Sequence, residues 1–210
     1  MKFGWIAIAF AAALVAFPAA AETSPQSLAL AERYMAATGG MYQTMLEQTY
    51  AAGRAIGNTS LARVQQRSLQ EAVVKHHDDL AALDGAVAAL MAQTFSDAEL
   101  SVAVAFLESP QGRSITEKKH AYFAQMFAPD RPALSFSPEE SAALAAYEKT
   151  PEAISLQAKA PALLAQTMAL SQPVILAVGR DARRIFCHQT LKCNSDGTFD
   201  ERGGPNITRP

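Results

Sequence analysis

The chain has 210 residues, of which 18 are basic and 20 acidic, so its formal net charge is −2. This length suits one domain or two small ones and allows a substantial core. Half of the residues are hydrophobic, and many of these are alanines, which favour helices. The slightly acidic balance argues against a nucleic-acid binder, which needs a basic surface.

The first 21 residues predict a cleavable signal peptide, with cleavage after about Ala21. Lys2 supplies a positive start, residues 3–15 are apolar, and Pro18 precedes the small residues 19–21. The alternative is a membrane anchor, because the uncharged run approaches the ~20 residues that a spanning helix needs. Pro18 and the alanines favour cleavage. No other segment is expected to be apolar enough to span a bilayer, so no transmembrane anchor is expected after cleavage.

The rest of the chain is predicted to be all-α. Four Ser-Pro or Thr-Pro pairs mark helix starts, because the hydroxyl caps the helix and proline fits its first position. Ser96 and Glu99 form a capping box at a fifth start. No stretch shows the alternation of a strand. The expected helices are 25–38, 41–56, 60–94, 97–108, 110–127, 138–148 and 151–186.

These helices predict one compact bundle, residues 22–194. Its parts are N-terminal helices in 22–94, a hairpin in 95–135 and a second hairpin with the last helix in 136–186. Pro161 and Pro173 are expected to kink or split that helix. The polar tail 195–210 is expected to be loose.

The two hairpins are interpreted as an internal duplication. Residues 95–125 and 136–166 align without gaps at an offset of 41. The identical pairs are Phe95/Phe136, Ser96/Ser137, Glu99/Glu140, Ala105/Ala146, Pro110/Pro151, Lys118/Lys159, Ala121/Ala162, Ala124/Ala165 and Gln125/Gln166. The similar pairs are Phe106/Tyr147, Ser109/Thr150 and Ile115/Leu156. Such a hairpin cannot bury its apolar face alone, so the two copies are expected to pack together. Chance similarity between alanine-rich helices is the alternative.

The first hairpin carries a family resemblance. The run from Phe95 to Leu100, followed by Ala105 to Gly112, resembles the signature of domain of unknown function family 2059, which consists of small exported proteobacterial proteins. The resemblance is specific over about 95–127 and looser over Ala29 to Tyr50. The second copy departs from it, with Ala153 in place of Gly112. The resemblance implies a helical periplasmic protein of unassigned function and supplies no catalytic residues.

Cys187 and Cys193 are the two cysteines of the chain. An even count in an oxidising compartment predicts a structural disulfide, worth about 2 kcal/mol for so small a loop. Positions six apart on a helix lie ~9 Å apart along its axis, so the helix is expected to end near Phe186. The alternatives are a metal site formed with His188 and a redox switch, which usually has closer cysteine spacing.

Histidines and acidic residues supply the candidate ligand contacts. His76, His77 and Asp79 lie in a metal-like run, but helical chelation needs a spacing of three or four residues, which only His76 and Asp79 have. His76 also falls in the apolar register, which favours a hydrogen-bonded core histidine. His120 follows two lysines on the first hairpin, a pattern typical of a solvated face. We expect neither a metal nor a cofactor.

No catalytic motif is present. The sequence has no Gly-x-Ser-x-Gly elbow, phosphate-binding loop, dinucleotide fingerprint or His-Glu-x-x-His. The leading hypothesis is a non-catalytic envelope protein that binds another protein, a peptide or the membrane face, as a monomer or a homodimer. The second is a small-molecule or metal carrier that uses His76, His77 or His120. The third is a hydrolase with a dispersed site.

Overall fold

The protein is described from a computed structural model that places residues 24–56, 60–123, 125, 133–190 and 193. These ranges are helical and contain no strand, which confirms the all-α prediction. The helices are α1 (Pro25–Ala37), α2 (Gly40–Ile56), α3 (Ser60–Lys75), α4 (His77–Thr94), α5 (Asp97–Leu107), α6 (Pro110–Phe123), α7 (Pro138–Glu148) and α8 (Pro151–Thr190).

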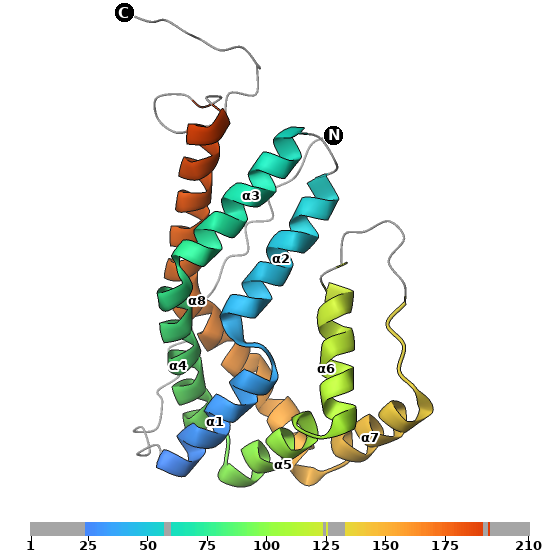
Figure 1. Ribbon diagram of the computed structural model, residues 1–210. Helices are drawn as coiled ribbons and strands as arrows, with labels where there is room; N and C mark the ends of the chain where they lie inside the picture. The colour runs from blue at the N-terminus through green and yellow to red at the C-terminus, as the bar shows by residue number, and fades with distance from the viewer. Residues whose placement is uncertain (1–23, 57–59, 124, 126–132, 191–192, 194–210) are drawn as a thin grey trace, which may run out of the picture.

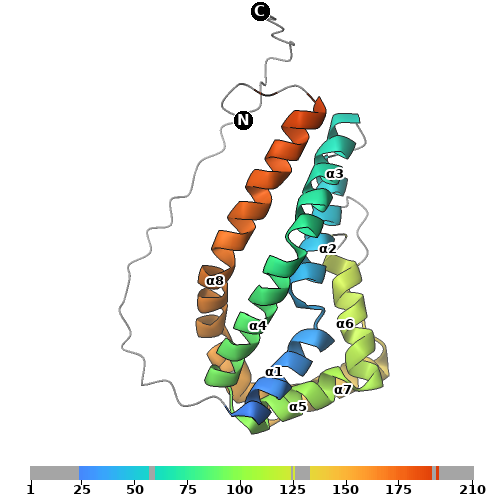
Figure 2. The ribbon, with the colours of Figure 1, turned by 60° about the vertical axis from the view of Figure 1, so that its left-hand side comes forward.

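The longest helix, α8, forms one side of the bundle (Figures 1 and 2). Helices α3 and α4 follow one another along α8, α2 packs on α3, and α1 packs on α4 and α5. At the opposite end from the α3 start, α5 and α7 lie crosswise, and α6 rises from them beside α2 (Figure 1). The two short helices thus close one end of the molecule.

The core lies where α1, α3, α4, α5 and α8 meet, and it extends to one residue of α6. The largest fully buried apolar side chains are Val73, Leu80, Leu100, Val104, Val178 and, from α6, Ile115. Burying a side chain of this size contributes roughly 1.5–3 kcal/mol relative to exposing it. Val73 and Leu80 are members of the apolar register that the sequence shows in 69–90, so this register is the inward face of α3 and α4.

Side-chain caps set the helix starts as the sequence predicts. Ser24 accepts a hydrogen bond from the Ser27 N–H at the start of α1. Ser96 and Ser137 each form a complete capping box with the glutamate three residues later. Each box satisfies two of the N–H groups that a helix start leaves without a partner.

The predicted helix 60–94 is wrong in one respect, because it is two helices, α3 and α4, that meet at His76. The backbone of His76 has φ −95° and ψ 22°, away from helical values. Its side chain bonds carboxylates of α4 and α8, which accounts for the departure there. The chain continues as a single helix through Asp84 and Gly85, which lie inside α4.

The last helix also differs from prediction. It runs unbroken through Pro161 and Pro173 and ends at Thr190 rather than near Phe186. Residues 160–179 carry no charge, and one 18-residue window of α8 has a mean hydropathy of 1.5. By length and composition α8 is therefore apolar enough to cross a membrane, so the expectation that no such segment follows the signal peptide is wrong. The expectation assumed that Pro161 and Pro173 divide the helix into shorter pieces, whereas the helix runs through both and is long enough to span.

The two phenylalanines that precede the capping boxes are not equivalent in burial, although the predicted duplication pairs them. Phe95 is 4% exposed and belongs to the core. Phe136 lies in the non-helical segment before α7, is only partly buried, and is not a member of that core. The two phenylalanines therefore lie in different surroundings. The reason is that α5 packs on α1 and α8, whereas α7 packs mainly on α6 at the edge of the bundle.

The expected signal peptide 1–21 and loose tail 195–210 lie outside the described residues. Helix α6 ends at Phe123 rather than at 127, and most residues just beyond it also lie outside the description.

Candidate functional site

The uncovered side of α8 is the main apolar surface. Only 11% of its most apolar window is buried, and Figure 2 shows that no described helix covers the side of α8 that faces away from α3 and α4. Among the described residues, the large hydrophobic side chains exposed on α8 are Ile154, Leu164, Met168, Leu170, Ile175 and Leu176. Exposed apolar groups gathered on one face mark interaction surfaces, whereas scattered ones do not.

A polar cleft lies between α1, α2 and the α5–α6 turn. It has a volume of about 590 Å³, within the range of small-molecule sites. On one side His120 of α6 faces Glu47 of α2, with 2.6 Å between Nδ1 and a carboxylate oxygen. Arg33 of α1 makes a two-pronged ion pair with Glu108 at the other side. The guanidinium, the imidazole and two carboxylates thus already pair with one another inside this cleft.

A smaller cleft of about 390 Å³ adjoins the Gly39-Gly40 turn. The N–H of Met41 donates to Asp84 at 2.7 Å, so α4 supplies the cap for the start of α2. Burial raises the pKa of Asp84, and the Met41 hydrogen bond opposes that rise. Gly40 has φ +62°, and a Cβ there would lie 2.6 Å from Asp84. The turn therefore requires glycine because of both its backbone and this close carboxylate.

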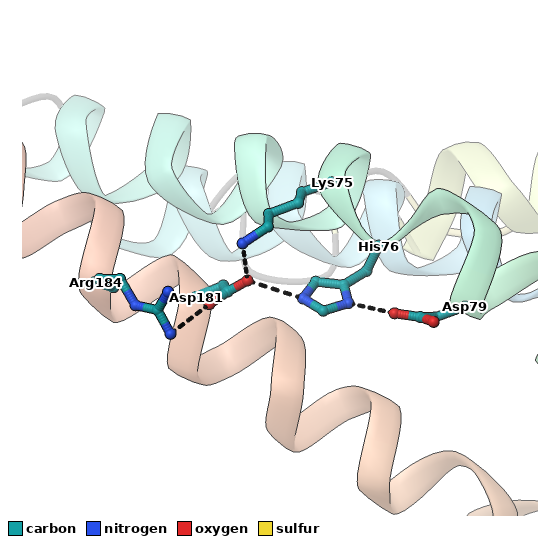
Figure 3. Close-up of polar contacts among 5 residues, drawn as sticks. All are labelled: Lys75, His76, Asp79, Asp181 and Arg184. Carbon is teal, nitrogen blue, oxygen red and sulfur yellow. Dashed lines mark hydrogen bonds and ion pairs between the residues drawn. The ribbon is translucent and has the colours of Figure 1, made fainter.

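Asp181 of α8 is the centre of a charged network (Figure 3). One oxygen accepts from Lys75 at 2.6 Å and lies 3.1 Å from His76 Nε2. Arg184 lies 3.1 Å from the other oxygen. The hydrogen bond from Lys75 lowers the pKa of Asp181, against the effect of burial, and His76 and Arg184 lower it further. This network joins α8 to the α3–α4 junction.

His76 lies between two carboxylates in that network. Its Nδ1 is 2.6 Å from Asp79, opposite the nitrogen that faces Asp181 (Figure 3). Its side chain is mostly buried, in keeping with the apolar register of its position. The arrangement satisfies both ring nitrogens inside the protein, and it connects helices rather than facing a cleft.

Two ion pairs link the two short hairpins. The ammonium of Lys159 in α8 lies 2.8 Å from each carboxylate oxygen of Glu99, which is in the first turn of α5, and donates to both. Glu140, in the first turn of α7, accepts from Lys118 of α6 at 2.6 Å. Phe106 and Tyr147 stack between them, with ring centroids 4.4 Å apart and planes 7° apart. Each glutamate therefore caps its own helix and pairs with a lysine of the other hairpin.

These contacts shift both carboxyl groups. Burial alone would raise the pKa of Glu99, but hydrogen bonds from Lys159, Ser155 and the Ser96 N–H outweigh it and lower the pKa to about 2. Hydrogen bonds from Lys118, Ser114 and the Ser137 N–H lower the pKa of Glu140 to about 2. Both groups are anions at neutral pH and have a structural role.

The other predicted ligand contacts are dispersed. His77 is exposed and makes an edge-on contact with Tyr42. His188 is exposed near the end of α8. Within the described part of the chain, no three His, Cys, Asp or Glu side chains lie together as a metal site would require. Of the predicted contacts, His120 alone lines one of the two clefts.

The predicted disulfide is confirmed. Cys187 and Cys193 are bonded, with 5.3 Å between their Cα atoms. Helix α8 continues to Thr190, so residues 188–190 are helical and do not turn back as expected. The bond fastens the chain that follows α8 to its last turn.

Several signature residues shape the hairpin turns. Ser109 accepts from the N–H of Gly112 at 3.0 Å. A Cβ on Gly112 would overlap the carbonyl oxygen of Phe106, so this turn admits only glycine. Phe95 is buried in the core and lies beneath the Lys159 ammonium at 6.0 Å. The signature therefore describes a packed turn rather than a reactive site.

Sequence reasoning missed Glu47, Arg33 and Asp181. Each pairs with a residue at least 73 positions away, and no local pattern surrounds them. A charged residue inside an apolar register, as Asp181 is between Val178 and Ala182, is the one signal that would have pointed to a buried partner.

Comparison with known families gives one match. Residues 81–128, which form most of α4 and all of α5 and α6, match the model of a family described as uncharacterized protein conserved in bacteria (DUF2059). This confirms the resemblance inferred from the first hairpin; the looser resemblance over 29–50 falls outside the matched residues. No curated protein and no solved structure matches the chain.

Proposed function

We propose that the chain is an exported, non-catalytic protein of the bacterial periplasm that binds other proteins through the open face of α8. The observation that carries the proposal is the exposure of large apolar side chains along a helix that lacks charge from 160 to 179. Burying such a face releases its apolar area from water, which is the main driving force of protein association. The N-terminal pattern, with cleavage after about Ala21, supports export.

Site-specific photo-crosslinking in intact cells tests this proposal. A photoreactive residue replaces Met168, which is 61% exposed on α8, or Val74, which is 57% exposed on α3. We expect protein adducts at 168 that mass spectrometry can identify and no such adducts at 74. An unmodified chain at both positions would contradict the proposal. Fractionation of the same cells, with the mature mass, tests export and cleavage.

The duplication is part of the proposal. We infer that 95–125 and 136–166 descend from one hairpin that paired with itself. In support, Glu99 pairs with Lys159 and Glu140 pairs with Lys118. Glu99 is equivalent to Glu140 and Lys118 to Lys159, so the two contacts are the same contact made in both directions between the copies. Phe106 stacks on Tyr147, its own equivalent. Reciprocal contacts of this kind are characteristic of a two-fold, self-complementary pair.

A small-molecule carrier is the second candidate, favoured by the cleft at His120. The imidazole and Glu47 lie only partly exposed in it. A bound ligand raises apparent stability, so thermal unfolding with divalent metals and with periplasmic extract tests this function. A stabilisation that His120→Ala abolishes and His77→Ala preserves supports the carrier. Unchanged unfolding under all conditions would remove it.

A further inference from the structure

We propose that the partner on the open face of α8 is a second copy of this chain, with the two α8 helices antiparallel and the two-fold axis at Met168. This inference rests on the proposed function, since it uses the same surface, and it names the occupant. Of the nine large hydrophobic side chains exposed among the described residues, six lie on α8.

The spacing of the exposed side chains favours a helical partner. Ile154, Pro161, Met168 and Ile175 follow one another at intervals of seven residues, and Leu164 lies three after Pro161. All five are exposed. A seven-residue apolar repeat is one part of the pattern by which helices pair side by side. At the positions three residues on, only Leu164 is apolar and exposed, since Gln157 is polar and Ser171 and Val178 are buried. The small exposed residues beside it, Ala158, Ala165 and Gly179, allow a second helix to approach closely.

The face of α6 that is equivalent in sequence to the open face of α8 has a different composition. In α6 that face is charged, lines the cleft and packs against α2. In α8 the positions 41 residues later carry no charge and are exposed. The equivalent pairs are Arg113/Ile154, Thr116/Gln157, Glu117/Ala158, His120/Pro161 and Phe123/Leu164. Loss of the charges fits a face that meets an apolar helix in place of α2.

The absence of charge also selects the occupant. From 160 to 179 the helix offers no ion-pairing group, so it does not select a partner of opposite charge, whereas an uncharged apolar face is complementary to itself. A helix that lies on an anionic membrane carries basic residues along its polar side. Here the basic residues of α8 flank the apolar run: Lys159 precedes it and pairs with Glu99, and Arg180, Arg183 and Arg184 follow it.

That basic cluster decides the orientation. In a parallel pair the three arginines of each copy would lie beside those of the other, and like charges at close range destabilise a complex. An antiparallel pair centred on Met168 separates the two clusters.

The size of the face sets the strength of the dimer. From Ile154 to Ala182 a helix rises about 42 Å and is about 10 Å wide, so two such faces bury on the order of 800 Å² together. Stable interfaces bury roughly 1,200–2,000 Å². We therefore expect a dimer that dissociates on dilution, with a dissociation constant on the order of micromolar.

Analytical ultracentrifugation of the mature chain, with its disulfide intact, tests the dimer. At about one hundred micromolar we expect twice the monomer mass, and the monomer mass at about one-hundredth of that concentration. Leu164→Glu and Met168→Glu are expected to remain monomeric at both concentrations. Val74→Glu is the matched control, since Val74 is as exposed as these residues but lies on α3, and it should dimerise as the parent does. Circular dichroism confirms that each variant is folded.

A cysteine at the axis tests the register. Met168→Cys on one copy would lie opposite Met168→Cys on the other, so mild oxidation should give a covalent dimer, while Val74→Cys should not. A parent chain that is monomeric at the higher concentration overturns the inference, as does equal loss of dimer in Val74→Glu. A monomer that sediments with anionic lipid vesicles through Leu164 also overturns it. A monomer that still crosslinks to other proteins at 168 overturns the second copy but leaves the proposed function intact.

Discussion

The hairpin α5–α6 and the hairpin formed by α7 and the start of α8 share their caps but differ in their surroundings. Both begin with a complete capping box, and in each a lysine forms an ion pair with the capping glutamate of the other hairpin. Yet α6 packs on α2, whereas the equivalent face of α8 is open, and Phe95 is buried where Phe136 is only partly so. The comparison teaches that local capping and mutual pairing can stay constant while the outer face of a helix changes its role.

The sharpest difference lies in the turns. Gly112→Ala would place a methyl against a backbone carbonyl, whereas Ala153 occupies the equivalent position, fully buried, in the second turn. We expect Gly112→Ala to lower the free energy of unfolding by about 3 kcal/mol. Ala153→Gly should cost only about 1 kcal/mol, through helix propensity. Urea denaturation measures both, and equal losses would show that the two turns are interchangeable.

The paired glutamates come next in expected effect. Glu99→Gln weakens a charged hydrogen-bond pair whose carboxylate is almost completely buried, and we expect a loss of about 2 kcal/mol. Glu140→Gln should cost less, because Lys118 and Glu140 lie nearer the edge of the bundle and Glu140 is slightly more exposed. Urea denaturation of the two variants, with exposed Glu139→Gln as control, ranks them. The reverse order would mean that the α7 pair carries more of the packing.

Acid should act on both hairpins together. The pKa of each glutamate is about 2, below its ordinary value of 4.5. A carboxyl with a lowered folded-state pKa contributes stability that is full above its unfolded-state pKa and is lost as the pH falls through its folded-state pKa. The free energy of unfolding should therefore fall between pH 4.5 and about 2.

The variant Glu99→Gln/Glu140→Gln isolates this contribution. Its free energy of unfolding should depend less steeply on pH over the same interval, with Asp181, whose pKa is also lowered, providing part of the remaining slope. Urea titrations at a series of pH values measure it. An unchanged slope would assign the acid sensitivity to other carboxyl groups.

The stacked rings are expected to give the smallest effect. A double-mutant cycle with Phe106→Leu and Tyr147→Leu should yield a coupling free energy of about 1 kcal/mol, the usual worth of an aromatic pair beyond its buried area. Phe123→Leu with Tyr147→Leu is the control, since Phe123 contacts Tyr122 rather than Tyr147. Coupling no larger than in this control would mean that the rings fill space without a specific interaction.

Much of the fold was predictable because the signals are local. Caps depend on residues within four positions of one another, as at Ser96 and Glu99, so the helix starts could be read directly. The break at His76 could not, because no local signal marks it and one of the two carboxylates that His76 contacts there, Asp181, lies 105 residues away. The continuity of α8 through Pro161 and Pro173 was missed because proline is normally costly within a helix, whereas packing against α3, α4 and α5 holds this helix together.

The candidate sites divide in the same way. The sequence indicated His120 as a candidate contact but not Glu47, with which it pairs. It could not predict that Leu164 and Met168 are exposed. Helix content, helix starts, the paired cysteines and the resemblance over 95–127 follow from composition and short-range spacing, which the sequence contains in full. The tertiary structure alone decided which lysine meets which glutamate, which histidine faces a cleft and which side of α8 stays open. Those outcomes depend on how whole helices pack, and a helix with two apolar sides does not specify which of them it buries.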